Sequence, residues 1–125
     1  MKTILIIEDN DKNMKLTREL LRAKGYATLE AVTGEAGVSL ALEHHPDLVL
    51  MDIQLPDIDG IQALGRMHAD PAGAAIPVVA FTASVTAAER SRIAGAGFSA
   101  FVSKPIDVRD FLARIAEVLD HGRSS

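Results

Sequence analysis

The sequence predicts an α/β fold in which one parallel sheet of five strands carries helices on both faces. Short apolar runs alternate with longer segments of helical period along all 125 residues. Most of the short runs are apolar throughout, as expected of strands that are covered on both faces of a parallel sheet. A strand followed by a helix, repeated five times, implies right-handed crossovers and therefore a doubly wound sheet.

The five expected strands are short. Residues 4–7, 48–51 and 78–81 are uniformly apolar and indicate buried strands. Residues 100–102 form a shorter run of the same kind. Residues 27–32 instead alternate in polarity, which predicts a strand at the edge of the sheet.

The segments that follow the strands have the apolar spacing of amphipathic helices. We expect their inward-facing stripes to consist of Leu16, Leu20 and Leu21 in the first, Val38, Leu40, Ala41 and Leu42 in the second, Ile61, Leu64 and Met67 in the third, Ile93 in the fourth, and Val108, Phe111, Leu112, Ile115 and Leu119 in the fifth. Gly25 predicts the end of the first helix. Thr86 and Glu89 have capping-box spacing at the start of the fourth, which residues 95–97 end. Gly60 is expected to allow the backbone conformation of a tight loop that leads into the third helix.

Length and composition indicate one domain over residues 1–121 and a short tail at 122–125. The chain has no cysteine, so disulfides and thiolate metal sites are excluded. A net charge of -4 without any basic block argues against a nucleic-acid surface. The apolar run at residues 4–7 is too short for a signal peptide or a membrane span. We therefore expect a cytoplasmic protein that binds neither nucleic acid nor membrane.

Reactive side chains lie at the ends of four of the expected strands. Glu8 and Asp9 follow the first strand, Asp52 the third and Thr82 the fourth, and Lys104 lies near the end of the fifth. Because ligands bind beyond the carboxyl ends of parallel strands, these side chains should meet at one rim of the sheet. Any one of them could be a solvated residue at a strand-to-loop junction, but five at successive strand ends indicate a site.

Three carboxylates at one rim require a counter-charge. Two carboxylates about 4 Å apart repel by about 4 kcal/mol at an effective dielectric constant near 20. A hard divalent cation fits oxygen ligands, and so few carboxylates leave room for waters and a phosphate oxygen, which is the pattern of Mg²⁺. Lys104 could then contact one phosphoryl oxygen while the Thr82 hydroxyl donates to another. Asp52 would be the nucleophile, forming an acyl phosphate by in-line attack.

The segments IIEDN, MDIQLPDIDG, VVAFTA and FVSKPI resemble, in their order and spacing, the receiver domains of two-component response regulators. The resemblance covers essentially the whole chain. It implies a flavodoxin-like receiver fold with strand order 2-1-3-4-5, which places Asp9 and Asp52 on neighbouring strands. Among receivers, IEDN with NMKL, GYATLEA and MDIQLP most resembles single-domain DivK-like cell-cycle regulators. Receivers of hybrid histidine kinases share much of this pattern.

The resemblance also implies roles for individual residues. Asp52 is the expected phosphoacceptor. The expected Mg²⁺ ligands are the carboxylates of Glu8, Asp9 and Asp52 and the backbone carbonyl of Gln54. The expected switch residues are Thr82, Lys104, Phe101 and Pro105, with a cis bond before the proline. Phe101 lacks the hydroxyl with which a tyrosine at this position could hydrogen-bond. The expected surface for docking the phosphoryl donor consists of Asn13, Leu16, Pro105 and Ile106.

The expected function is phosphorelay signalling. A histidine kinase or a histidine phosphotransfer protein would donate the phosphoryl group, with Mg²⁺ as cofactor, and the modified domain would change which proteins it binds. Protein binding is the expected output because no effector-domain pattern follows the receiver, and a role in cell division fits the DivK-like pattern. We expect a monomer or weak dimer that modifies only itself and is not a conventional enzyme. The alternative is a receiver module that belongs to, or acts with, a hybrid histidine kinase.

Three other classes of function fit the residues less well. Dehalogenase-like phosphatases need a second aspartate two residues after the nucleophile, where this chain has Gln54. Flavodoxin-like cofactor binders need a neutral phosphate loop after the first strand, and the acidic residues 8–11 would repel a phosphate there. A degenerate receiver that serves only as a scaffold would not need the complete set of reactive residues.

Overall fold

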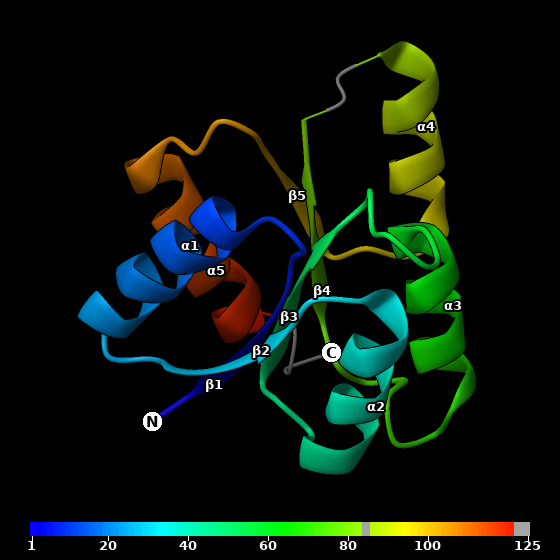
Figure 1. Cartoon of the computed structure of the whole chain (residues 1–125), viewed down its shortest axis with the longest axis horizontal. Coiled ribbons are helices and arrows are strands. Elements are labelled where there is room, and N and C mark those ends of the chain that lie inside the picture. The colour runs from blue at the N-terminus through cyan, green and yellow to red at the C-terminus, as the bar shows by residue number, and fades with distance from the viewer. Residues whose placement is uncertain (84–85, 122–125) are drawn as a thin grey trace.

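The computed structural model describes residues 1–83 and 86–121, so the predicted tail at 122–125 lies outside the described residues. Strands and helices alternate and build one parallel sheet between two layers of helices (Figure 1). The strands are β1 (Thr3–Ile7), β2 (Ala27–Ala31), β3 (Leu48–Asp52), β4 (Val78–Thr82) and β5 (Ala100–Ser103). The helices are α1 (Asp11–Ala23), α2 (Gly34–His44), α3 (Gly60–Ala69), α4 (Ala87–Ala96) and α5 (Val108–His121).

The strand order is β2-β1-β3-β4-β5, and every neighbouring pair is parallel. This order confirms the predicted topology, including the edge position of β2. Helices α1 and α5 cover one face of the sheet, and α2, α3 and α4 cover the other (Figure 1). Within the described residues, no helix combines the length and apolar character needed to cross a bilayer.

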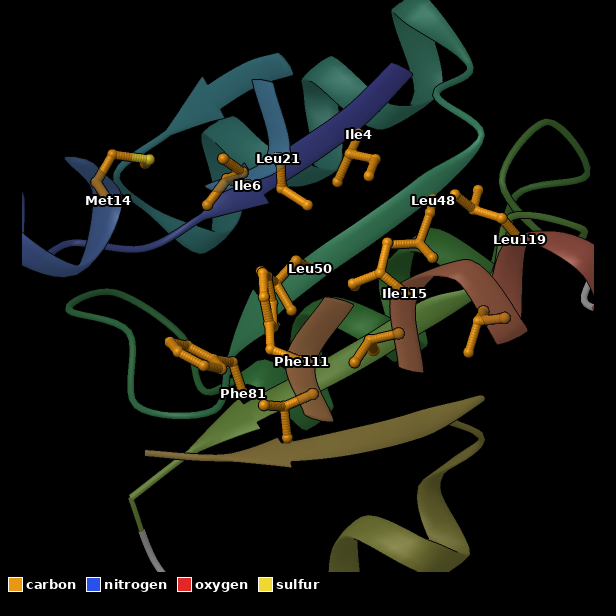
Figure 2. Close-up of a cluster of buried hydrophobic side chains, with 13 residues drawn as sticks. Ile4, Ile6, Met14, Leu21, Leu48, Leu50, Phe81, Phe111, Ile115 and Leu119 are labelled. Atoms are coloured by element: carbon orange, nitrogen blue, oxygen red, sulfur yellow. The ribbon is translucent and has the colours of Figure 1, made fainter. Parts of the chain in front are cut away.

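The sheet separates two main parts of the core. Alternate residues of β1 point to opposite faces, because side chains in a strand have a period of two. Ile4 and Ile6 pack with Phe111 on the α1/α5 side, a cluster drawn in Figure 2. Leu5 and Ile7 pack on the α2/α3 side. Both faces of the central strands are thus buried, which explains why these strands are continuous apolar runs in the sequence.

Two residues of the predicted helix stripes are exposed instead of buried. Leu16 is 44 % exposed and Val108 is 45 % exposed. The buried residues of α1 are Met14, Thr17 and Leu21. The predicted stripe was rotated away from the true inward face, because a stripe drawn through apolar residues could not include the polar Thr17. The edge strand also ends one residue earlier than predicted, at Ala31.

The predicted ends of two helices are confirmed. The Glu89 amide donates to the Thr86 hydroxyl over 3.1 Å at the start of α4. Gly97 ends the same helix in the left-handed region, with φ of 109°. Gly25, with φ of 90°, follows the last turn of α1. Glycine is favoured at both points because it has no Cβ to resist positive φ.

Gly60 has a different role from the one predicted. It is the first residue of α3, and positive φ among the described glycines occurs only at Gly25 and Gly97. A Cβ on Gly60 would lie 2.7 Å from the backbone oxygen of Asp52 and 2.8 Å from Cα of Ile53. Glycine is therefore required by the close approach of α3 to the end of β3, which carries Asp52.

This packing predicts opposite effects for two glycine-to-alanine substitutions in α3. Gly60→Ala should lower the free energy of unfolding by about 1–3 kcal/mol, because the contacting atoms belong to the backbone and cannot turn aside. Gly65→Ala should raise it by about 0.5–1 kcal/mol, because a Cβ at Gly65 would meet nothing within 4 Å and alanine favours the helix. Urea unfolding of both variants measures the two effects. Equal effects would contradict the assignment of Gly60 as a packing residue.

Candidate functional site

The carboxyl ends of four strands bring the predicted site residues to one rim. Asp52 and Thr82 are the last residues of β3 and β4, not the first residues after them as predicted. Glu8 and Asp9 follow β1, and Lys104 follows β5. Ligand oxygens of Glu8, Asp9 and Asp52 lie within 4.8 Å of one another. The predicted acidic cluster is therefore present in the folded chain.

Lys104 bridges two of the three carboxylates. Its Nζ lies 3.0 Å from Oε2 of Glu8 and 2.9 Å from Oδ2 of Asp52. Glu8 is 2 % exposed and Asp52 is 5 % exposed, whereas Asp9 is exposed. Charge-assisted hydrogen bonds between buried groups are stronger than those at the surface. The ammonium is therefore held directly beside the Asp52 carboxylate.

The pKa values of the rim reflect this crowding. Burial, together with the negative charge of Asp52, raises the pKa of Glu8, although hydrogen bonds from Lys104 and from the Asn10 amide oppose the rise. Burial by itself would lower the pKa of Lys104, but its hydrogen bonds to Asp52 and Glu8 outweigh burial and the pKa is raised. Lys104 thus stays charged at neutral pH, and one ammonium faces three carboxyl groups.

Other predicted site residues surround this centre. The Gln54 backbone amide donates to Oδ1 of Asp52 over 2.9 Å, which fixes the second carboxylate oxygen. Thr82 is 2 % exposed. Phe101 is partly buried against the cluster of Ile53, Ala80 and Ile93 beneath α4. The bond between Lys104 and Pro105 is cis, as the resemblance implied.

The residues predicted to dock a phosphoryl donor differ in exposure. Leu16 and Pro105 are exposed. Asn13 is partly buried, and its backbone amide donates to the side-chain oxygen of Asn10 over 3.0 Å. Ile106 is also partly buried, because it packs against the core on the α1/α5 side. Leu16 and Pro105 are thus the two of the four that a partner could reach directly.

Asp57 has a structural role that sequence reasoning missed. Its carboxylate accepts hydrogen bonds from the amides of Gly34 at 2.8 Å and Glu35 at 2.9 Å. These amides begin α2, whose first N–H groups lack partners within the helix. Asp57 therefore ties the loop after β3 to the helix after β2. No local signal could reveal this contact, since 22 and 23 residues separate the partners.

The bonds at Asp57 predict a specific loss of stability in acid. The Glu35 amide, followed by that of Gly34, lowers the pKa of Asp57 from 3.8 to about 2. A carboxyl group whose pKa is lowered in the folded state stabilises the fold at pH values above its pKa in the unfolded state. This contribution is lost as the pH falls through its pKa in the folded state. Asp57→Asn should therefore be less stable than the wild type above pH 3.8, and the difference should shrink between pH 3.8 and about 2.

Urea unfolding of both proteins across that pH range measures the difference. Asp120→Asn, at an exposed position of α5, serves as the matched control. A difference between wild type and Asp57→Asn that stayed constant down to pH 2 would contradict the assignment.

Phe81 is a second residue whose role was not anticipated. It was predicted only as part of a buried strand, yet Nζ of Lys104 lies over its ring, 4.8 Å from the centroid. An aromatic side chain immediately before Thr82 was the available signal, because that position neighbours the reactive rim.

Comparisons with known proteins agree with this geometry. A model of the response regulator receiver domain family matches residues 4–116. The polar-differentiation response regulator DivK of Brucella ovis is 43 % identical over 118 residues, which cover 94 % of this chain and 96 % of that protein. A CheY-like receiver domain protein from Methanospirillum hungatei JF-1 superposes with a TM-score of 0.89 at 29 % identity, covering 98 % of this chain and 96 % of that one. The receiver domain of the sensor histidine kinase PA1611 from Pseudomonas aeruginosa PAO1 superposes with a TM-score of 0.85 at 29 % identity, covering 99 % of this chain and 98 % of that one. That receiver domain was solved with a magnesium ion coordinated in its active site cleft.

Proposed function

The chain belongs to the response regulator receiver domain family, and from that membership we propose that it is a phosphorelay switch whose phosphoacceptor is Asp52. The observation that carries the proposal is the contact of the Lys104 ammonium with the buried Asp52 carboxylate, at 2.9 Å, beside two further acidic groups. An ammonium in that place can receive a phosphoryl oxygen as soon as Asp52 is modified.

The acidic rim also has the donor set that Mg²⁺ requires. Three carboxylates and one ammonium leave two negative charges, which a divalent cation balances. Oxygen ligands within 4.8 Å of one another suit a small hard ion. We propose Glu8, Asp9, Asp52 and the backbone carbonyl of Gln54 as its ligands. The ion would neutralise charge on the phosphoryl oxygens during transfer.

The proposed reaction transfers a phosphoryl group from a phosphohistidine to Asp52. A carboxylate oxygen of Asp52 attacks phosphorus in line with the leaving imidazole nitrogen, so that an O–P bond forms as the P–N bond breaks. The released imidazole takes a proton from solvent. Lys104 turns from Glu8 to a phosphoryl oxygen, and the Thr82 hydroxyl donates to another. The donor is a histidine kinase or a histidine phosphotransfer protein acting in the cytoplasm.

The proposed output is a change in protein binding on the face formed by α4, β5 and α5. Helix α4 is the element easiest to move, because Ile93 is its one buried residue among those described. The partly buried ring of Phe101 packs against the cluster that contains Ile93 of this helix, and the guanidinium of Arg90 lies over the ring, 5.7 Å from its centroid. We propose that Phe101 shifts when Thr82 and Lys104 move toward the phosphate. We propose a target in the control of cell division on the basis of the DivK-like sequence pattern, and the relatives it resembles are named for polar differentiation.

Incubation with acetyl phosphate and Mg²⁺ tests this function. Intact-mass spectrometry should show one added phosphoryl group, peptide mapping should place it at Asp52, and hydroxylamine should remove it, because an acyl phosphate is labile to that nucleophile. Chelation of the metal with EDTA should prevent labelling. A label that resists hydroxylamine, or that forms equally well without divalent metal, would refute the proposed chemistry.

A further inference from the structure

The Lys104 ammonium has a third neighbour besides its two carboxylates. Its Nζ lies 4.8 Å from the centroid of Phe81 and over the face of that ring. An ammonium group has three N–H donors, of which Glu8 and Asp52 take two. The electron-rich face of an aromatic ring attracts a cation, and the attraction is stronger where water is excluded. Phe81 therefore occupies a side of the ammonium that would otherwise need solvation.

The residue that supports Lys104 has a fixed place in the sheet. Phe81 lies in β4, 2 % exposed, and is paired in register with Asp52 of β3. Its carbonyl accepts a hydrogen bond from the Ile53 amide over 3.2 Å. The ring packs against Phe111, which is fully buried, with centroids 6.4 Å apart and planes inclined by 54°. Figure 2 shows the two rings within the core on the α1/α5 side. The strand pairing and this backbone hydrogen bond thus hold Phe81 beneath the rim, and Phe111 fills the core beside its ring.

From this geometry we infer that Phe81 is a positioning residue, whose ring face holds the Lys104 ammonium beside Asp52. A lysine side chain has a flexible four-carbon stem and loses rotamer entropy when its end is held in one place. The ring and Asp52 together restrict that end before any phosphoryl group arrives. When Lys104 exchanges Glu8 for a phosphoryl oxygen, the ring contact can persist, because Asp52 and the phosphoryl oxygen then take two of the three N–H donors, as Asp52 and Glu8 do before the exchange. The inference rests on the proposed function of Lys104.

Two matched substitutions separate this role from simple packing. Phe81→Leu and Phe111→Leu remove the same ring from the same core cluster. Among the described residues, cations lie over the rings of Phe81 and Phe101, and none lies over Phe111. We expect labelling of Asp52 by acetyl phosphate to slow by about five- to thirtyfold in Phe81→Leu. It should stay within about twofold of wild type in Phe111→Leu, although both variants lose stability.

A spectroscopic readout follows the contact without any phosphorylation. The ε-methylene protons of Lys104 should be shifted upfield in the wild type by the ring current of Phe81. The shift should disappear in Phe81→Leu and remain in Phe111→Leu. Should Phe81→Leu fail to fold, fluorinated phenylalanines at position 81 keep the shape of the ring while weakening its attraction for cations, and labelling should slow with each added fluorine.

The outcomes are distinct. Three results would each overturn the role of Phe81. They are equal slowing of labelling in Phe81→Leu and Phe111→Leu, a labelling rate that fluorination does not affect, and Lys104 protons that are unshifted in a wild-type protein that labels normally. A wild-type protein that shows the shifted protons but never becomes labelled would refute the proposed phosphorelay function, and with it the role assigned to Phe81.

Discussion

Asp52→Asn will abolish labelling by acetyl phosphate while leaving the domain folded. The amide oxygen that replaces the carboxylate is a poor nucleophile, so no acyl phosphate can form at that position. The substitution keeps the shape of the side chain, and its oxygen can still accept the Gln54 amide that Asp52 accepts over 2.9 Å. Lys104 retains Glu8, at 3.0 Å, so its charge remains paired. Intact-mass spectrometry measures the labelling, and thermal unfolding followed by circular dichroism measures the stability.

Asp11→Asn is the matched control for this experiment. Asp11 is an exposed carboxylate at the start of α1, two residues after Asp9, and does not belong to the acidic cluster. Its replacement removes the same charge near the rim, and we expect labelling at the wild-type rate. Persistent labelling of Asp52→Asn would show that another residue accepts the phosphoryl group. Loss of labelling in both variants would indicate a general requirement for negative charge instead of a nucleophile at Asp52.

The rim could be predicted from sequence because of the parallel sheet. All strands in such a sheet point the same way, so residues at their carboxyl ends must share an edge, whatever the order of the strands. Glu8, Asp52 and Lys104 were predicted to meet at one rim on that argument alone, and in the structure Lys104 contacts both carboxylates. Which strands are neighbours was not contained in the apolar pattern. That information came from the resemblance of whole motifs to receiver domains.

The contacts that sequence reasoning missed depend on side-chain placement in three dimensions. Helical spacing predicted that Leu16 faces inward, but Leu16 is exposed and the polar Thr17 occupies the inward face of α1. Asp57 and Phe81 each act on a partner more than twenty residues away, Glu35 and Lys104 respectively. Neither pairing leaves a periodic signal, since each depends on how two loops or strand ends meet at the rim.

A single charge on the predicted docking surface should separate protein donors from small donors. Leu16→Asp is expected to slow transfer from a phosphorylated histidine phosphotransfer domain by about ten- to a hundredfold, which is the effect of losing one interface hot spot. Leu16 is 44 % exposed on α1, so a charge there costs the folded domain little but must be desolvated under a partner. Acetyl phosphate needs no such surface and should label Leu16→Asp at the wild-type rate.

Ile106→Asp should give the same selectivity with a larger loss of stability, because Ile106 packs partly against the core. Ile106 is next to the exposed Pro105 and two residues after Lys104, so it is close in sequence to the rim at which the proposed phosphohistidine would bind. Ala75→Asp is the control that should leave transfer from both donors unaffected. Ala75 is exposed in the loop before β4, at the amino ends of the strands and therefore opposite the rim. Stopped-flow transfer and acetyl phosphate labelling, measured on the same preparations, give the two rates for each variant. If Leu16→Asp slowed both donors equally, the mutation would have damaged the site or the fold, and Leu16 would have no place in donor docking.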